Sequence, residues 1–158
     1  MKLNKFFRLL AFILVSELSG FIGTLFTTPS IPTWYAFLNK PAFTPPNWLF
    51  APAWTILYLL MGISVFLIWE KKSESKEKKT AIQIFFIQLA ANMVWSIIFF
   101  GLQMPFIALL EIIVLWFLIL ITILKFNKLN KVAAYLLIPY IIWTSFALIL
   151  NLAIVLLN

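Results

Sequence analysis

The chain of 158 residues contains no cysteine and no histidine. These absences exclude disulfides, thiol catalysis, acid–base catalysis by imidazole, haem ligation by either residue and the usual zinc and copper sites. Glycine is rare, and Gly20, Gly23, Gly62 and Gly101 have no spacing that builds a phosphate-binding loop. We therefore expect no metal site, no cofactor, and neither a nucleotide-driven pump nor a dinucleotide enzyme.

Charged residues are also scarce, at 11% of the chain, whereas 64% of the residues are hydrophobic and the mean hydropathy is +1.06. A helix needs about 20 mainly apolar residues to cross a hydrocarbon layer of about 30 Å, and it satisfies its own backbone. A membrane β-barrel would alternate with period two, but residues 112–121 are apolar without a break. The sequence therefore predicts an all-α membrane protein, a bundle of five transmembrane helices. We expect one transmembrane domain over residues 1–158, with helices at about 9–27, 46–69, 81–102, 105–124 and 132–157.

The basic residues are divided unequally among the segments outside these helices. In chain order the six segments hold 3, 1, 5, 0, 3 and 0 of them, so eleven of the twelve fall on one side of the bundle. Because Lys and Arg in short loops favour the cytoplasmic side, the pattern predicts a multi-pass protein of the cell membrane with a cytoplasmic N-terminus and an extracytoplasmic C-terminus. The net charge of +7 then reflects topology and contact with anionic lipid headgroups. We expect the lipid bilayer, and no nucleic acid, as the partner of these charges.

The connection between the first two predicted helices is rich in proline. Pro41, Pro45 and Pro46 fix φ and remove backbone donors, so the chain up to Pro45 cannot form one continuous helix, although a short helix fits around residues 34–39. Pro46 suits the first turn of the second helix. Pro52 predicts a bend one to two turns into that helix.

The same connection is rich in aromatic residues, among them Trp34, Tyr35 and Phe43. One interpretation is an aromatic belt at the membrane interface, where Trp and Tyr are enriched. The other is a proline-stiffened lid that holds these three side chains over the open end of the bundle. The residues alone favour neither.

Three motifs occupy this loop and the start of the second helix: Trp34-Tyr35, Leu38-x-Lys40-Pro41-x-Phe43-x-Pro45-Pro46 and Phe50-x-Pro52-x-Trp54-x-x-Leu57-Tyr58. Two more lie in the third and fifth helices: Gln88-x-x-x-Asn92-x-x-Trp95-Ser96 and Leu137-x-Pro139-Tyr140-x-x-Trp143-x-x-Phe146-Ala147-x-x-Leu150-Asn151. In kind and order these motifs resemble the tryptophan-rich sensory protein family (TspO/MBR), to which the mitochondrial translocator protein, or peripheral-type benzodiazepine receptor, belongs. The resemblance spans nearly the whole chain.

This resemblance implies a five-helix bundle, often a homodimer, with a pocket for porphyrins such as protoporphyrin IX, for benzodiazepine-site drugs and for sterols. Porphyrin is then a ligand rather than a cofactor. Tyr35, Trp54, Asn92 and Trp143 match positions that line that pocket. Trp54 and Trp143 also match tryptophans linked to porphyrin breakdown in some members, so the resemblance leaves open a light- and oxygen-dependent catalytic role for this pair.

Helical spacing is compatible with such a pocket, because residues three and four apart share a helix face. The second, third and fifth helices each present aromatic and amide side chains on one face, which suits stacking and apolar burial of a flat macrocycle. The alternative is packing and interhelical hydrogen bonding. The predicted ligand-binding residues are Trp34, Tyr35, Phe43, Trp54, Tyr58, Gln88, Asn92, Trp95, Trp143, Phe146 and Ala147. We expect the first and fourth helices to serve mainly as scaffold.

Two carboxyl groups, Glu17 and Glu111, stand at membrane depth and lie outside the family pattern. Charged groups are costly there and often functional. Small residues around Glu17 predict a close helix contact, either within the bundle or between protomers. Glu17 also supports an alternative function, a small proton-coupled multidrug exporter, although such exporters have four helices and no proline-aromatic loop.

Lys40 is the only basic residue on the predicted outer side. One hypothesis pairs its ammonium with porphyrin propionates, and the other places it in the headgroup layer with its stem on loop aromatics. The proposed cholesterol-recognition pattern is absent from the fifth helix, because no basic residue follows Tyr140. High-affinity sterol binding is therefore not expected from that pattern.

Overall fold

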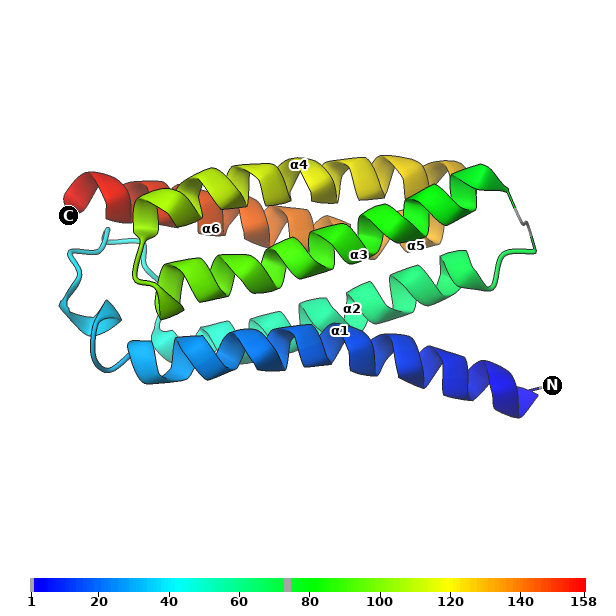
Figure 1. Ribbon diagram of the computed structural model, residues 1–158, viewed down its shortest axis with the longest axis horizontal. Coiled ribbons are helices and arrows are strands. Elements are labelled where there is room, and N and C mark those ends of the chain that lie inside the picture. Colours follow the sequence, from blue (N-terminus) through cyan, green and yellow to red (C-terminus); the bar gives the residue numbers. More distant parts are fainter. Residues whose placement is uncertain (1, 73–74) are drawn as a thin grey trace.

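The computed structural model describes residues 2–72 and 75–158 (Figure 1). The described residues form helices and no strand. The helices are α1 (Lys2–Ser30), α2 (Phe50–Trp69), α3 (Lys76–Ser96), α4 (Pro105–Leu129), α5 (Lys131–Tyr135) and α6 (Ile138–Leu157), with 3-10 turns η1 (Tyr35–Phe37) and η2 (Asn47–Leu49) and a π turn η3 (Ile97–Gly101). Five stretches are long and apolar enough to cross a membrane: Asn4–Ser30, Asn47–Trp69, Lys76–Gly101, Pro105–Leu129 and Lys131–Leu157. The predicted all-α, five-helix membrane architecture is confirmed.

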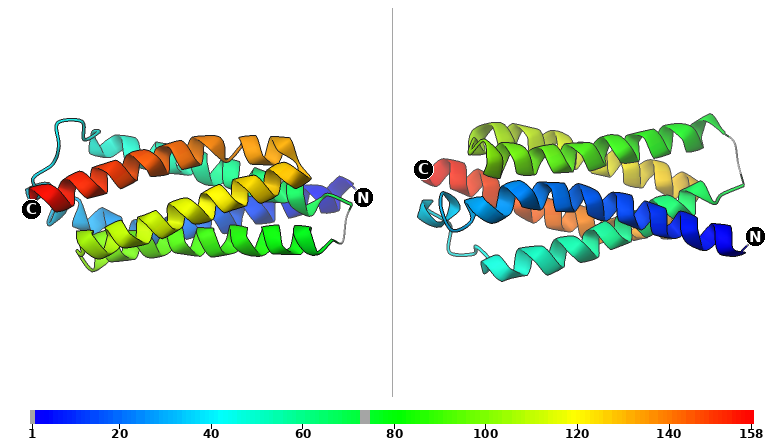
Figure 2. Two further views of the ribbon diagram at one scale, coloured as in Figure 1. Left: turned by 90° about the horizontal axis from the view of Figure 1, so that it is seen from above. Right: turned by 60° about the horizontal axis from the view of Figure 1, so that its bottom comes forward.

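The helices run side by side in an elongated bundle (Figures 1 and 2). We call the end that holds the N-terminus and the α2–α3 connection the basic end, and the end that holds the C-terminus and the α1–α2 loop the loop end. α1 packs on α2 and α3, while α4 packs on α3, α5 and α6. At the basic end the Glu70 carboxylate pairs with Arg8 at 2.9 Å and lies 4.0 Å from the Lys5 ammonium.

Several helices begin at other residues than hydropathy predicted. α1 starts at Lys2 instead of residue 9. α3 starts at Lys76 instead of residue 81, because the Ser75 hydroxyl accepts a hydrogen bond from the Lys78 amide at 3.2 Å and caps the helix. In both cases the helix begins with a polar first turn that precedes the apolar span. A hydropathy window detects only the apolar part.

The start of α2 also differs from the prediction. Pro46 is extended and precedes the η2 turn, so α2 begins only at Phe50. Pro52 therefore lies in the first turn of α2. Backbone amides in a first turn have no partner within their own helix, so proline removes no such bond there and no kink is required.

The fifth span is divided where the sequence predicted one helix over 132–157. Pro139 has no N–H to donate to the Tyr135 carbonyl, and the chain makes a turn at residues 136–137 between α5 and α6. In this turn the Leu137 amide bonds to the Ala134 carbonyl at 3.1 Å, which leaves the Ala133 carbonyl without its helical donor. The Ser64 hydroxyl of α2 donates to that carbonyl at 2.7 Å and so ties the break to a neighbouring helix.

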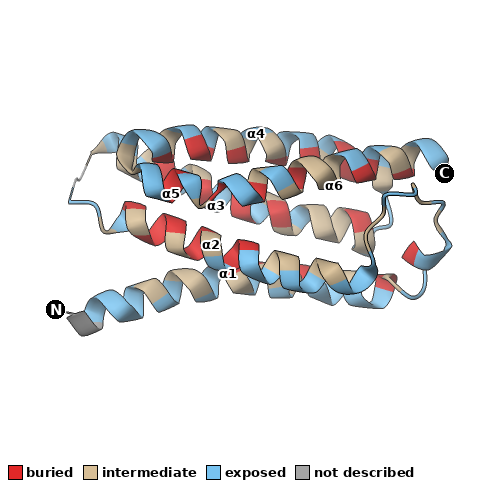
Figure 3. Ribbon diagram, turned by 180° about the vertical axis from the view of Figure 1, so that it is seen from behind, coloured by how far each residue is buried: buried red, intermediate tan, exposed pale blue. Residues whose placement is uncertain are grey.

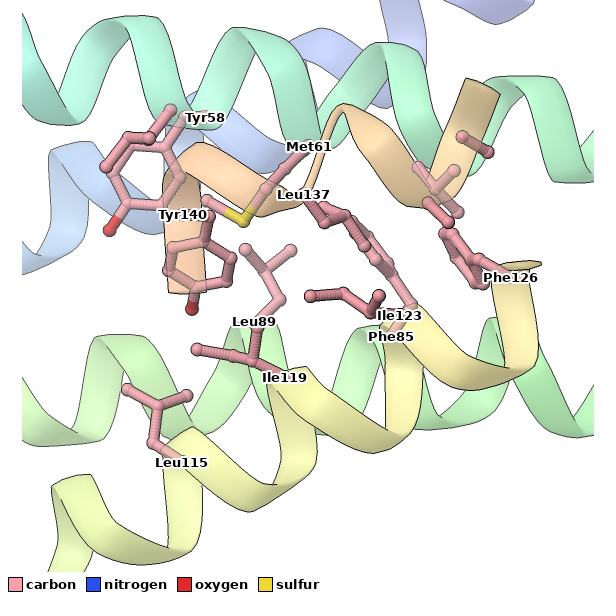
Figure 4. Packing of buried hydrophobic residues seen from close by; sticks show 14 of the residues in the cluster. Tyr58, Met61, Phe85, Leu89, Leu115, Ile119, Ile123, Phe126, Leu137 and Tyr140 are labelled. Atoms are coloured by element: carbon pink, nitrogen blue, oxygen red, sulfur yellow. The ribbon is translucent and has the colours of Figure 1, made fainter. Parts of the chain in front are cut away.

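The largest part of the core fills the space between α2, α3, α4 and the α5–α6 span (Figure 4). Met61 and Phe126 are fully buried there, and Phe85 stacks on Phe126 with 6.0 Å between ring centroids. A smaller cluster around Tyr35, Phe99 and three other buried residues lies at the loop end. Dense packing toward the basic end thus leaves the open space of the bundle at the loop end.

α1 lies at the edge of the bundle, and much of its outer face is exposed (Figure 3). It is held by small residues: a Cβ on Gly62 would lie 2.6 Å from the Ile13 Cα, and one on Gly20 would lie 2.2 Å from the Tyr58 ring. The Ser19 hydroxyl adds a hydrogen bond to the Leu89 carbonyl at 3.2 Å. Of the two contacts that the small residues near Glu17 left open, the structure shows the one within the bundle.

Candidate ligand-binding site

A cavity of about 450 Å³ lies in the loop-end half of the bundle, between α1, α2, α3 and α6. Its volume and its apolar, aromatic lining are typical of small-molecule sites. No residue of α4 or α5 lines it. The aromatic residues of its wall are Phe21, Tyr35, Phe50, Trp54, Tyr58, Trp95, Phe99, Phe100, Trp143 and Phe146.

Most of the predicted site residues line this cavity. They are Tyr35, Trp54, Tyr58, Trp95, Trp143, Phe146 and Ala147. The loop supplies Tyr35, α2 supplies Trp54 and Tyr58, and α6 supplies Trp143, so residues far apart in the sequence share one space. Trp54 and Trp143, the pair matched to porphyrin breakdown, both face it.

Aromatic rings line the cavity wall along each of these helices. Trp54 and Tyr58 stack within α2 at 5.5 Å and 28°, and Trp95 stacks on Phe99 at 5.2 Å and 25°. Trp143 lies 5.7 Å from Phe146 within α6. Rings that stack along a helix expose their edges and faces to the space beside it, so the cavity offers several aromatic surfaces to a flat ligand.

Trp34 and Phe43 do not line the cavity. Trp34 packs edge-on against Phe99 at 5.6 Å, and Phe43 packs edge-on against Phe146 at 6.3 Å while half of its surface stays exposed. Both loop residues therefore support wall residues from outside the cavity.

Gln88 and Asn92 are buried behind the wall. Tyr58 donates its hydroxyl hydrogen bond to the Asn92 side-chain oxygen, and Tyr140 donates to Gln88 Oε1 at 2.9 Å. The two amides thus hold tyrosines in place, as the packing alternative proposed for them. Trp95 is held in a similar way, because its indole N–H donates to Asn151 Oδ1 at 3.2 Å.

The π turn η3 contributes a wall residue that helical spacing did not predict, Phe100. Phe99 and Phe100 are neighbours in sequence, yet both line the cavity, because the wider turn changes the helical register at the end of α3. The reversal that follows needs a left-handed residue, Gln103, with φ of 56°. No motif in this run distinguishes a π turn from a regular helix.

The first helix, expected to serve mainly as scaffold, also forms part of the cavity wall. Glu17, Phe21, Thr24 and Thr28 line the cavity from α1, together with Gly20. Their spacing of three and four residues puts them on one helix face. This spacing was visible in the sequence, but hydropathy alone gave it no weight.

Lys40 holds the loop together. Its ammonium donates to the backbone carbonyls of Tyr35 at 2.8 Å, Leu38 at 3.0 Å and Ala36 at 3.3 Å, and it lies 4.9 Å from the Tyr35 ring centroid. All three ammonium hydrogens therefore have partners within the loop. Burial of the phenol raises the pKa of Tyr35 above its ordinary value.

The loop is also tied to α6. The Asn39 amide donates to Asn158 Oδ1 at 2.9 Å, and Asn158 Nδ2 donates to the Asn39 carbonyl at 3.0 Å. Tyr35 faces the cavity, whereas Phe37 and Trp48 point outward with 86% and 71% of their surface exposed. Of the three side chains in the lid interpretation only Tyr35 lines the cavity, and the outward orientation of Phe37 and Trp48 is the one that the belt interpretation expects.

Comparison with known proteins identifies the family. The model of the TspO/MBR family matches residues 12–157. The chain is 48% identical over 153 residues to tryptophan-rich protein TspO of Archaeoglobus fulgidus, covering 96% of this chain and 97% of that protein. It is 36% identical over 141 residues to the translocator protein of Bos taurus, covering 89% of this chain and 83% of that protein. The chain therefore belongs to the TspO/MBR family of multi-pass membrane proteins.

Proposed function

We propose that this protein is a membrane receptor that binds porphyrins, protoporphyrin IX among them, and related flat hydrophobic molecules such as benzodiazepine-site drugs. The observation that carries the proposal is the cavity at the loop end, whose walls carry stacked ring pairs on α2 and along α3 and η3, and a tilted pair on α6. Well-placed aromatic pairs add about 0.5 to 1.5 kcal/mol each beyond apolar burial. Sterols, which lack an aromatic plane, are expected to bind less tightly.

The same geometry supports a second step of this proposal, a role for Trp54 and Trp143 in porphyrin breakdown. Both indoles face the cavity, from α2 and α6. A ligand between them would contact both rings. In this proposal light and oxygen supply the oxidising chemistry, and the two indoles lie where they can exchange electrons with the bound macrocycle.

The proposal includes the setting in the membrane. The positive-inside pattern assigns eleven basic residues to the cytoplasm, and all of them except Lys2 lie at or near the basic end. These ten are Lys5, Arg8, Lys71, Lys72, Lys76, Lys78, Lys79, Lys125, Lys128 and Lys131. Lys40 lies at the loop end. We therefore place the N-terminus in the cytoplasm and the cavity in the outer half of the bilayer, and we expect a homodimer, as in the family.

Titration of the purified protein with protoporphyrin IX, followed by tryptophan fluorescence, tests the binding step. We expect quenching in the wild type, weaker binding in Trp54→Phe and Trp143→Phe, and an unchanged affinity in the control Trp69→Phe, whose side chain lies outside the cavity. Absence of quenching in the wild type would overturn the proposal. Under illumination, a Trp→Phe variant that binds porphyrin but forms no product would support breakdown, whereas product formation in both variants would exclude the two indoles.

The alternative function, a proton-coupled multidrug exporter, has one observation in its favour, since Glu17 lines the cavity. The five spans and the family membership both depart from that class. Efflux of a lipophilic cation from vesicles, driven by a pH gradient and abolished by Glu17→Gln, would favour the exporter.

A further inference from the structure

We propose that Glu17 makes the cavity selective for arylalkyl ammonium ions, in which an alkyl linker joins an ammonium group to an aromatic ring system. The ammonium group pairs with the Glu17 carboxylate while the ring system stacks on the aromatic wall. The inference rests on the proposed use of the cavity as a ligand site and names a ligand class for it. It assigns a role to a residue outside the family motifs.

The position of Glu17 is the first argument. It lies midway along the Asn4–Ser30 span. Of the residues that the structure describes, Glu17 is the only acidic one that lines the cavity, and no Lys or Arg among them does. The cavity therefore has one carboxyl group at its deep end and no basic group of its own among the described residues.

The second argument is that Glu17 lacks a counter-ion. Both ion pairs among the described residues involve Glu70, at the basic end of the bundle. In the same part of the chain no hydrogen bond reaches the Glu17 side chain, although the hydroxyls of Thr24 and Thr27, which also line the cavity, donate to backbone carbonyls of α1. A charged carboxylate at mid-membrane depth is costly without a partner, so a cationic ligand group that enters the cavity gains a strong interaction there.

The third argument is the aromatic surface beside the carboxyl group. Tyr58 packs directly on Gly20, one turn beyond Glu17, and stacks on Trp54, while Phe21 lines the cavity from the same face of α1 as Glu17. A cation near aromatic faces is attracted by the ring quadrupole, and this attraction grows when water is excluded. A carboxylate combined with aromatic faces is a recognition set for ammonium groups.

The same arrangement should set the orientation of an anionic ligand in the cavity. Propionate groups of a porphyrin would be repelled by Glu17 and would point toward the loop end, where Asn47 and Thr28 line the cavity. Loss of the Glu17 charge should therefore weaken the binding of ammonium ligands, whereas porphyrin binding should stay the same or become stronger. This opposite response separates a specific site from general damage to the cavity.

The test uses two probes of equal shape: an anthracenylmethyl trimethylammonium ion and its neutral analogue with carbon in place of the nitrogen. Affinities are measured by tryptophan quenching of the whole protein in nanodiscs of zwitterionic lipid, which removes surface charge as a source of preference. We expect the wild type to bind the cation about tenfold more tightly than the neutral probe, a modest ratio for a desolvated ion pair with cation–π contacts. In Glu17→Gln the ratio should fall to about one, with protoporphyrin IX still bound.

Glu111→Gln is the matched control, because Glu111 is the other carboxyl group at membrane depth and does not line the cavity. It should keep the wild-type ratio. Equal binding of the two probes by the wild type, or an unchanged ratio in Glu17→Gln, would overturn the inference, and the wild-type result decides even if a variant does not fold. If protoporphyrin IX binds while neither probe does, this inference fails alone; if nothing binds, the proposed function fails with it.

Discussion

The two halves of the bundle use aromatic residues in opposite ways. Toward the basic end, Phe85 of α3 stacks on Phe126 of α4, so the rings fill the space between helices. At the loop end, the stacked pairs lie along one helix segment, as Trp54 does with Tyr58, and the space between the helices stays open. The direction of stacking, rather than the number of aromatic residues, thus separates a packed core from a cavity.

The glycine and lysine residues of the two halves also differ in what they contact. Gly62, toward the basic end, lets the α1 and α2 backbones touch, whereas Gly23, at the loop end, faces only the Ser96 side chain. The Lys71 ammonium of the basic end donates to the Leu129 carbonyl and connects two helices, whereas the Lys40 ammonium donates within its own loop. Changes toward the basic end should therefore alter stability, and changes at the loop end should alter binding.

The largest expected effect is that of Gly62→Ala. The added Cβ would lie 2.6 Å from the Ile13 Cα, and backbone cannot move aside as a side chain can. We expect a loss of about 1 to 3 kcal/mol in the free energy of unfolding, measured in mild detergent. Ligand affinity of the folded fraction should be unchanged, because Gly62 does not line the cavity.

Gly23→Ala is the matched variant at the loop end. Its Cβ would lie 3.1 Å from the Ser96 hydroxyl oxygen and 3.2 Å from the Ser96 Cβ, so a small shift of one side chain relieves the contact. A stability loss equal to that of Gly62→Ala would contradict the division into a packed half and an open half.

A smaller effect is expected from Lys40→Met, which keeps the aliphatic stem and removes the ammonium. Loss of three hydrogen bonds to carbonyls should loosen the loop around Tyr35 and weaken ligand binding about threefold to tenfold, with little change in thermal stability. Affinities for protoporphyrin IX and for its dimethyl ester should fall together, because the ammonium is engaged by the loop. Weakening of the free acid alone would favour the hypothesis of a propionate contact.

The sequence predicted the spans well because hydrophobic length is a local property. Trp54 and Trp143 could be placed in one site because their motifs resemble those of the family, and helical spacing was compatible with that placement. The contribution of Phe100 could not be foreseen, since a π turn depends on tertiary packing that leaves no local pattern. Glu17 was noticed as an unusual residue, but its place on the cavity wall follows from how α1 docks on Tyr58.

The smallest effect is expected from changes in the Asn39–Asn158 pair. They test whether the α1–α2 loop is held over the cavity by Lys40 alone or also by its contact with the end of α6. The pair exchanges two exposed hydrogen bonds, at 2.9 and 3.0 Å, between the loop and the end of α6. Both bonds use the Asn39 backbone and therefore survive Asn39→Ala, which removes only the bond from Asn39 Nδ2 to the Leu157 carbonyl at 3.2 Å. Asn158→Ala removes both bonds of the pair. We expect Asn158→Ala to speed ligand dissociation about twofold and Asn39→Ala to have less effect, since exposed hydrogen bonds contribute about 0.5 kcal/mol. Stopped-flow quenching measures both dissociation rates. If Asn158→Ala changed ligand binding as much as Lys40→Met does, the position of the α1–α2 loop would depend mainly on its contact with α6.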